Sequence, residues 1–231
     1  MITQEGFLIA QGKRAYADGF VHKFGANHNV ENGVYETIWS PGGLYPWSAF
    51  DDIQTLYANS TTADAGSLTL QGLDEDYNPL SETITMAGTG FVNTQSQFKR
   101  LFRALYTSST TTNTGDILIR AGSSTGTIVA EVEADKGQTQ MAIYTVPANT
   151  TAYGVHYLVG SGKSSETRVE LYIRNPGESF RIQNAIEVSA TAIDVPFPVP
   201  FPMGPKTDID FRAFSANGGS AVVNFDLILQ K

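Results

Sequence analysis

Alternation of apolar and polar residues runs through most of the chain and predicts β-strands. In the segment TRVELYI, residues 167–173, every second residue is apolar, which is the pattern of a strand with one buried face. Turns rich in Gly, Asn, Ser or Asp separate such segments, as they do in sandwiches and barrels. We therefore expect an all-β protein, a jelly-roll-like antiparallel β-sandwich. Further strands are expected over residues 67–73, 116–121, 127–132, 140–146, 152–159, 180–188, 207–214 and 221–229.

The segment QFKRLFRALYT, residues 97–107, fits two patterns. Its apolar residues stand at i, i+3, i+4 and i+7 from Phe98, which is the helical template. At every second residue, however, Phe98, Phe102 and Tyr106 share one face. The flanks are rich in Thr and Ser and carry no good helix C-cap. This favours a strand over residues 98–106, with a helix as the alternative.

A short acidic loop lies inside a predicted β-hairpin. In LDEDYNPLSETIT, Asp74, Asp76 and Asn78 fall at alternate positions, as the first ligands of a calcium loop do. Such a loop also needs Gly at its sixth position and a bidentate Glu at its twelfth, where this chain has Pro79 and Thr85. We therefore expect a hairpin tip without a metal, and calcium chelation is expected to leave thermal stability unchanged.

Two segments lack the sustained alternation of the rest. Residues 1–50 are rich in Gly, Asn and aromatic rings, and only residues 34–39 fit a short strand. In DVPFPVPFPMGPK, residues 194–206, prolines alternate with apolar residues, so this rod is polyproline-like or lies at a sheet edge. We expect an N-terminal arm over residues 1–50 and a β-sandwich domain over residues 51–231.

The arm and the rod carry large rings that are candidates for contact with a partner. Large amphipathic rings dominate the energetics of protein interfaces. The alternative for the rings of the arm is that they pack on the body of their own chain. The candidate partner-binding residues are Phe24, Tyr35, Trp39, Tyr45 and Trp47 in the arm and Phe197 and Phe201 in the rod.

Charge and cysteine content exclude several classes of function. The net charge of −8 and the pI of about 4.8 disfavour nucleic-acid binding, because neutralising phosphates needs clustered Lys and Arg. No apolar run is long enough to span a bilayer, and the N-terminal residues do not fit a secretory signal. The chain has no cysteine, which excludes disulfides, zinc–thiolate sites and thiol catalysis. We expect neither a membrane nor a nucleic-acid partner.

Motifs that resemble catalytic or ligand sites do not meet the requirements of that chemistry. The loop SGKSS, residues 161–165, has Tyr157 where a phosphate loop requires Gly, and a predicted strand follows it. His22, His28 and His156 show no spacing typical of metal ligands. We expect no metal site and no cofactor.

A pair of carboxylates could still hydrolyse a glycosidic bond, because the separation of such a pair is a property of the fold. The candidates alternate with apolar residues, as solvent-facing strand positions do, so we expect no catalytic residue among them. These candidates are Glu131, Glu133, Glu170 and Asp210.

Five parts of the chain carry a family resemblance. They are VHKFGANHNV, IWSPGGLYPW, SLTLQGLDEDYNPLSETITMAG, GQTQMAIYTVPANTTAYG, and FPMGPKTDIDFRAF with the final FDLIL. In this order they resemble a group of small virion proteins of tailed bacteriophages, especially phages of marine bacteria and cyanobacteria. The resemblance covers the chain from about residue 20 to its end and implies no catalytic residues. Some β-rich proteins of this kind coat the capsid as decoration or cement proteins.

The resemblance implies a non-enzymatic structural component of a bacteriophage particle. We expect first a capsid decoration (cement) protein that is made in the host cytoplasm and resides on the capsid surface of the virion. Its expected partners are the major capsid protein or other virion proteins, and its expected oligomer is a homotrimer. One alternative is a tail, neck or fibre-base component. Another, from a different class, is a carbohydrate-binding or depolymerising module.

Overall fold

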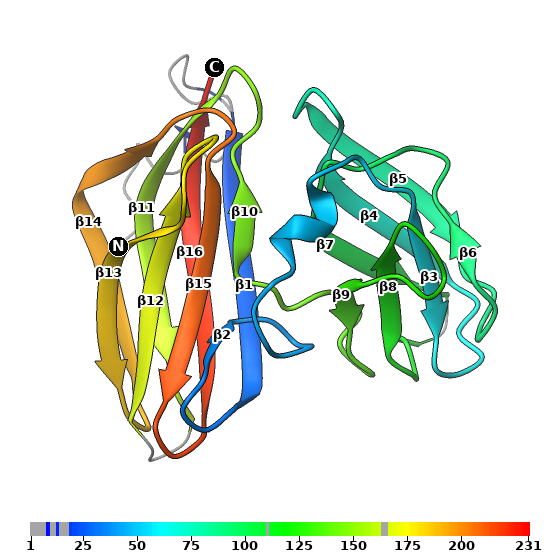
Figure 1. The fold of residues 1–231 in the computed structure, drawn as a ribbon, viewed down its shortest axis with the longest axis horizontal. Coiled ribbons are helices and arrows are strands. Elements are labelled where there is room, and N and C mark those ends of the chain that lie inside the picture. The colour runs from blue at the N-terminus through cyan, green and yellow to red at the C-terminus, as the bar shows by residue number, and fades with distance from the viewer. Residues whose placement is uncertain (1–7, 10–12, 14–18, 110, 163–165) are drawn as a thin grey trace.

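The computed structural model describes residues 8–9, 13, 19–109, 111–162 and 166–231. In this part of the chain it contains strands β1–β16 and one short 3-10 helix, η1 (Trp47–Phe50). The all-β class expected from the sequence is therefore confirmed. The strands form two β-sandwiches that lie side by side (Figure 1). No helix among the described residues is long and apolar enough to cross a membrane.

The first sandwich, called here the jelly-roll sandwich, contains both ends of the described chain. Its long sheet has, in spatial order, the strands β1 (Gly19–Val30), β16 (Gly219–Gln230), β11 (Thr151–Gly160) and β14 (Ala192–Met203). Its short sheet has β10 (Ile143–Thr145), β15 (Asp208–Ser215), β12 (Thr167–Arg174) and β13 (Arg181–Val188), and β2 (Tyr35–Thr37) also pairs with β15.

Strands β2 and β10 are two halves of one interrupted strand. Thr37 pairs with Arg212 and Ile143 pairs with Asp210, so the two halves lie end to end along β15. The chain leaves the sheet after β2 and returns before β10, where the N–H of Ala142 donates to the carbonyl of Ile38. When β2 and β10 are counted as one strand, the two sheets have the strand order of a double-sheet jelly roll.

The second sandwich, called here the inserted sandwich, is formed by the residues between these two halves. The antiparallel bridge between Trp39 and Met141 closes its base. One sheet has the order β6 (Val92–Asn93), β3 (Leu56–Ser60), β8 (Ile117–Ala121) and β9 (Ile128–Val132). The other has the order β5 (Pro79–Thr85), β4 (Ser67–Leu73) and β7 (Arg100–Thr107).

This organisation differs from the expected arm over residues 1–50 and single sandwich over residues 51–231. Residues 19–30 are strand β1 of the long sheet, and most of residues 1–18 lie outside the described part of the chain. Strand β1 lacks the usual alternation because polar residues such as Lys23 and Asn27 are buried in it, between the two sandwiches or against its neighbours. The strand expected over residues 98–106 is confirmed as β7.

Each sandwich has its own hydrophobic core. Alternate residues of β16, among them Val223, Phe225 and Leu227, point into the core of the jelly-roll sandwich. Phe50 and Phe98 lie in the core of the inserted sandwich. Full burial of such side chains stabilises the fold by about 1.5–3 kcal/mol each. Large apolar side chains that stay exposed outside these two cores are therefore candidates for contact with another molecule.

Candidate docking surface

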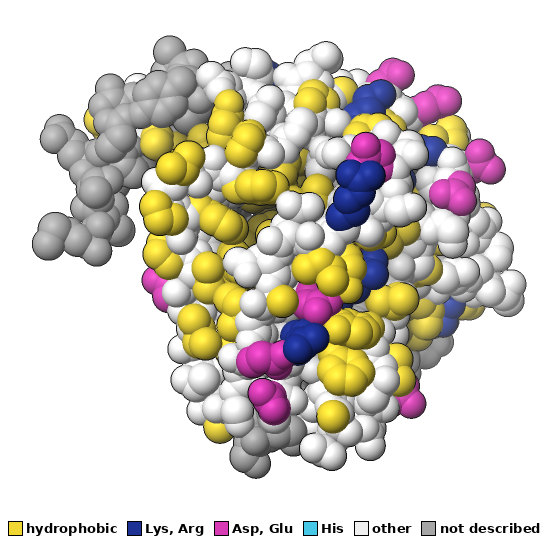
Figure 2. Space-filling view, turned by 60° about the vertical axis from the view of Figure 1, so that its left-hand side comes forward, with side chains coloured by type: hydrophobic (Ala, Val, Ile, Leu, Met, Phe, Trp, Pro, Cys, Tyr) yellow, Lys and Arg dark blue, Asp and Glu magenta, His cyan; other side chains and the backbone are white. Residues whose placement is uncertain are grey.

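The jelly-roll sandwich is open at the side where β13 and β14 are the last strands of the two sheets (Figure 1). Val199 is 80% exposed and Ile182 is 52% exposed on these strands. Figure 2 shows hydrophobic side chains gathered on this side of the molecule, around a hollow. We call this region the edge surface, and it comprises Ile186, Ile193, Val195, Phe197, Val199 and Phe201, whereas Ile182 pairs with Tyr172 on the outer face of the short sheet.

Both strands of the edge surface are poor templates for a further strand. Four prolines interrupt the donors of β14, at positions 196, 198, 200 and 202, so the Pro-rich segment is an edge strand, one of the two arrangements expected for it. Between Pro196 and Phe201 the pairing of β14 with β11 shifts register. Strand β13 carries a bulge at Gln183, where its pairing with β12 shifts. Prolines and bulges are common protections of sheet edges, so a partner would contact this surface through side chains.

A narrow crevice lies behind the edge surface, between the two sheets. The rings of Phe197 and Tyr157 are 5.5 Å apart, and Tyr157 is 5.4 Å from Phe211 in the core. The crevice has a volume of about 20 Å³, which is enough for one water-sized group. Phe197 and Phe201 therefore anchor β14 to the core from inside, while Val199 on the same strand faces outward.

Three of the seven candidate partner-binding rings lie inside the chain. Trp39, Tyr45 and Trp47 stack edge to face, with ring centroids 5.1 and 4.9 Å apart, and all three are buried. The indole N–H of Trp47 donates to Asp210, and Phe180 packs on the same indole at 5.5 Å. These rings fill the junction of the two sandwiches, which corrects the expectation that they face a partner. The rings are buried because residues of the jelly-roll sandwich, such as Asp210 and Phe180, cover them.

The other two rings of the expected arm are half-buried at separate places. Phe24 pairs with Asn224 on the outer face of the long sheet, whereas the next residue, Phe225, points into the core from the inner face. The ring of Tyr35 lies 4.9 Å from Phe214, and its hydroxyl donates to Glu170 over 3.1 Å. The structure thus brings only Phe197 and Phe201 of the candidate set together at the edge surface. Partner contact by Phe24 and Tyr35 stays a prediction.

A row of His and Asp side chains that was not predicted from the sequence crosses all four strands of the long sheet. His22 Nδ1 lies 2.6 Å from Asp226 Oδ1, and the other oxygen of Asp226 lies 3.5 Å from His156 Nδ1. His156 Nε2 lies 2.5 Å from Asp194. The four residues belong to β1, β16, β11 and β14, so only the register of the sheet aligns them. Among the described residues no group of three or more such side chains could hold a metal ion.

The candidate carboxylates are divided between the two sandwiches. Glu131 and Glu133 belong to the inserted sandwich, where burial, Asp116 and Glu133 together raise the pKa of Glu131 to about 7. Glu170 accepts from the hydroxyls of Tyr35 and Tyr172, and Asp210 is fully buried beside Arg212. Structural hydrogen bonds thus occupy Glu170 and Asp210, and these two do not face Glu131 and Glu133 as one pair.

One polar cleft does bring three carboxylates to its walls. Glu31, Glu36 and Glu133 line it, beside the ends of β1 and β2. Both oxygens of the buried Glu36 are hydrogen-bonded, one to the amide of Asn27 at 2.7 Å and one to the backbone N–H of Gly43 at 3.1 Å. This carboxylate therefore fixes the turn after β2.

The acidic loop of the sequence is the tip of the β4–β5 hairpin, as expected. Asp74 Oδ1 accepts from the backbone N–H groups of Asp76 and Asn78, at 3.0 and 2.8 Å. The side chain of Asp74 thus closes a turn of the Asx type, which is a frequent role of Asp at such positions.

Comparison with known proteins gives no family for this chain. No protein-family model and no curated protein sequence matches it. Among solved structures, that of infectious bursal disease virus, Gt strain, aligns with 91% of this chain and 72% of its own, at 8% identity and a TM-score of 0.25. The PBSX exported protein XepA aligns with 91% of this chain and 86% of its own, at 12% identity and a TM-score of 0.22. Similarity at this level carries no argument about function.

Proposed function

We propose that this protein is a non-enzymatic structural component of a tailed-phage particle, and first of all a decoration protein of the head. The edge surface is the observation that carries the proposal, because it contains Val199, which at 80% is the most exposed large apolar side chain of the described residues, ahead of Leu44 at 53%. The sequence resemblance to small phage virion proteins supports the same role. The partner in this proposal is the major capsid protein or another virion protein.

A firm connection between the two sandwiches supports a bridging role. Arg100 of the inserted sandwich is buried and binds Asp208 of the jelly-roll sandwich through Nε, at 3.1 Å. Arg174 binds the other oxygen of Asp208 at 2.6 Å, and Thr145 donates to Asp208 at 2.6 Å. Breaking a buried ion pair costs about 3–5 kcal/mol, so the two bodies are expected to move as one. A rigid body of this kind can brace neighbouring subunits of a shell.

A homotrimer is part of the proposal, because closed symmetric oligomers are the usual form of soluble homomers and can match a three-fold position on a shell. Light scattering over a range of concentrations tests this part. A mass of three chains agrees with it, whereas a single-chain mass at every concentration, both free and after release from particles, contradicts it.

The proposed location is tested on purified particles of the phage that encodes this chain. Electron cryo-microscopy of particles with and without the protein should show extra density on the head. Density at the neck or tail would instead identify the runner-up role, a tail, neck or fibre-base component. Absence of the protein from purified particles would contradict a virion role altogether.

A further inference from the structure

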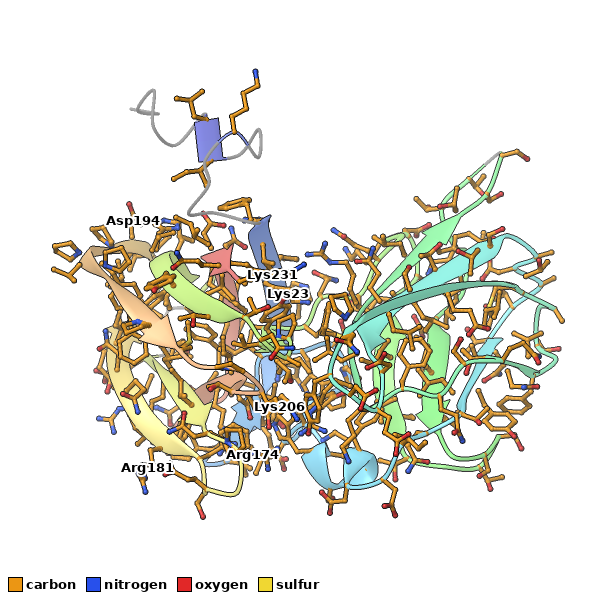
Figure 3. All side chains as sticks on the ribbon, turned by 90° about the horizontal axis from the view of Figure 1, so that it is seen from above. Lys23, Arg174, Arg181, Asp194, Lys206 and Lys231 are labelled. Atoms are coloured by element: carbon orange, nitrogen blue, oxygen red, sulfur yellow. The ribbon has the colours of Figure 1, made fainter. Side chains whose placement is uncertain are left out.

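A second surface lies where the two sandwiches meet, away from the edge surface. We call it the junction cleft; its volume is about 370 Å³. The hairpin tip of the inserted sandwich contributes Tyr77, and the jelly-roll sandwich contributes Arg174 and Lys206. Figure 3 shows Lys206 and Arg174 near the junction of the two bodies.

The junction cleft is locally positive on a chain whose net charge is −8. Four cations line it, Lys99, Arg100, Arg174 and Lys206, against three carboxylates, Asp51, Glu178 and Asp208, which leaves a formal excess of one positive charge (4 − 3 = 1). Glu178 is also drawn to Arg181, which lies outside the cleft, at 3.5 Å.

The positive charge is concentrated at the wall of the cleft. Two guanidinium groups, those of Arg100 and Arg174, share the single carboxylate of Asp208. One carboxylate neutralises only one of them, and both lie largely out of water, where an uncompensated charge is unfavourable. Aromatic rings offset this in part, since Arg100 lies over Tyr77 and Arg174 over Phe180, at 5.5 and 4.6 Å from the ring centroids. An anion in the cleft would compensate the remaining charge.

Lys206 is available to bind such an anion. Its ammonium group lies 4.9 Å from the centroid of the Tyr77 ring, and among the described residues no carboxylate is within ion-pair distance of it. Both Lys206 and Tyr77 have positive φ, of 63° and 64°, where glycine would be less strained. Among the described residues Asp135, Asn149 and Ala190 also have positive φ, so this conformation does not by itself mark a site.

We propose that the junction cleft binds an oxyanion, either a phosphate group or a carboxylate, with Lys206 and Arg174 as its main ligands. Nε and Nη2 of Arg174 already donate to Asp208, at 2.9 and 2.6 Å, so the anion would meet Nη1 of Arg174, and Lys206 adds a point charge. The proposal goes beyond attachment to a particle. Its test uses the isolated chain, so it stands or falls independently of the proposed virion role.

The experiment measures binding of inorganic phosphate to the full chain by titration calorimetry, at constant ionic strength with chloride as the balancing anion. The wild-type chain should bind phosphate, and Lys206→Ala should weaken the affinity tenfold or more. Lys136→Ala is the matched control, because Lys136 is an exposed turn lysine of the inserted sandwich, and it should keep the wild-type affinity. Lys206→Gly, which removes the side chain and relieves the positive φ, should fold at least as well as wild type and still lose phosphate.

Acetate in place of phosphate separates the two chemical sources. Acetate binding that depends on Lys206 assigns a carboxylate, and binding of phosphate alone assigns a phosphate group. The proposal is overturned if neither anion binds the wild-type chain, or if Lys206→Ala, Lys206→Gly and Lys136→Ala all bind with the wild-type affinity.

Discussion

Asp64 is a buried carboxylate that ties two loops of the inserted sandwich together. Its oxygens accept from the hydroxyl of Ser60 at 2.6 Å and from the backbone N–H groups of Thr114 and Gly115 at 2.8 and 3.0 Å. Burial alone would raise its pKa, but these hydrogen bonds outweigh burial and lower the pKa to about 2. The ionised form of Asp64 is thus part of the folded structure.

Replacement of Asp64 by Ala should therefore lower the free energy of unfolding by about 2–3 kcal/mol, because buried donors lose a charged acceptor. Chemical denaturation at pH 7 measures this change. Asp76→Ala, on the exposed hairpin tip, is the control and should change the free energy by less than about 0.5 kcal/mol. Equal effects of the two substitutions would show that Asp64 does not hold the loops.

The same carboxylate predicts an acid-dependent loss of stability. Because the pKa of Asp64 is lower in the folded chain than its ordinary value of 3.8, its contribution is present above about pH 4 and is lost as the pH falls through about 2. The difference in stability between wild type and Asp64→Asn should shrink over this range. A difference that stays constant from pH 5 to pH 2 would contradict the assignment.

Glu131 should show the opposite dependence on pH. Burial, followed by repulsion from Asp116 and Glu133, raises its pKa to about 7, above the ordinary value of 4.5. Stability is therefore full below about pH 4.5 and falls as the pH rises through about 7, where the folded chain must ionise this group. Glu131→Gln should stabilise the chain at pH 8 by about 1–2 kcal/mol, after screening by solvent, and change little at pH 4.

Thermal unfolding of wild type and Glu131→Gln at the two pH values measures this effect. Glu75→Gln, on the exposed hairpin tip, controls for the loss of one negative charge. An equal gain at pH 4 and pH 8 would contradict a titrating Glu131.

The burial of single residues was the least predictable property of this chain. Trp39, Tyr45 and Trp47 have the composition of an interface and lie in a stretch without periodicity, so the sequence fitted a core and a docking arm equally well. Their burial depends on residues far away along the chain: the hydroxyl of Tyr45 donates to the carbonyl of Leu101, and Phe180 packs on Trp47. No local pattern carries that information.

At the level of elements, β1 packs closely against the two segments that connect the sandwiches, one leaving after β2 and one returning before β10. Ala142 donates to the carbonyl of Ile38, so the outgoing and returning segments are hydrogen-bonded to each other. Gly25 of β1 lies directly against this pair. A Cβ at Gly25 would stand 2.2 Å from the backbone nitrogen of Ala142 and 2.6 Å from the carbonyl oxygen of Ile38.

Gly25→Ala should therefore destabilise the chain by about 1–3 kcal/mol or more, because backbone atoms on both sides must move. Gly19→Ala, in the same strand, is the matched control, since its Cβ would meet Leu229 only at 3.8 Å. Denaturant midpoints of the two variants measure the contrast. Similar midpoints would mean that β1 does not pack against the connecting segments at Ile38 and Ala142.

Strands were predictable from the sequence wherever one face is buried and the other wet. The alternation in residues 167–173 and 221–229 predicted β12 and β16 because each lies in a sheet with a core on one side. Strand β1 was missed because its buried positions include Lys23 and Asn27. The insertion of one sandwich into a strand of the other was also missed, since the pairing of β2 and β10 with β15 is long-range.

At the scale of the molecule, the two sandwiches are joined into one unit with two different surfaces, the edge surface and the junction cleft. Buried contacts at the junction, among them that of Arg100 with Asp208, hold the two sandwiches together. The edge surface of the jelly-roll sandwich lies at the side of the molecule away from the inserted sandwich (Figure 1). An attachment site there would leave the inserted sandwich projecting to reach a neighbouring subunit.

Occupancy on particles that lack the protein is the most direct test of attachment through the edge surface. Purified wild type, Val199→Asp and Val34→Asp would be mixed with such particles and quantified after sedimentation. Val199 is 80% exposed and Val34 is 42% exposed elsewhere, so both variants should keep the melting temperature of wild type. Val199→Asp should lose at least tenfold in apparent affinity, and Val34→Asp should bind as wild type does. Equal occupancy of all three proteins, or no binding of wild type, would contradict attachment through this surface.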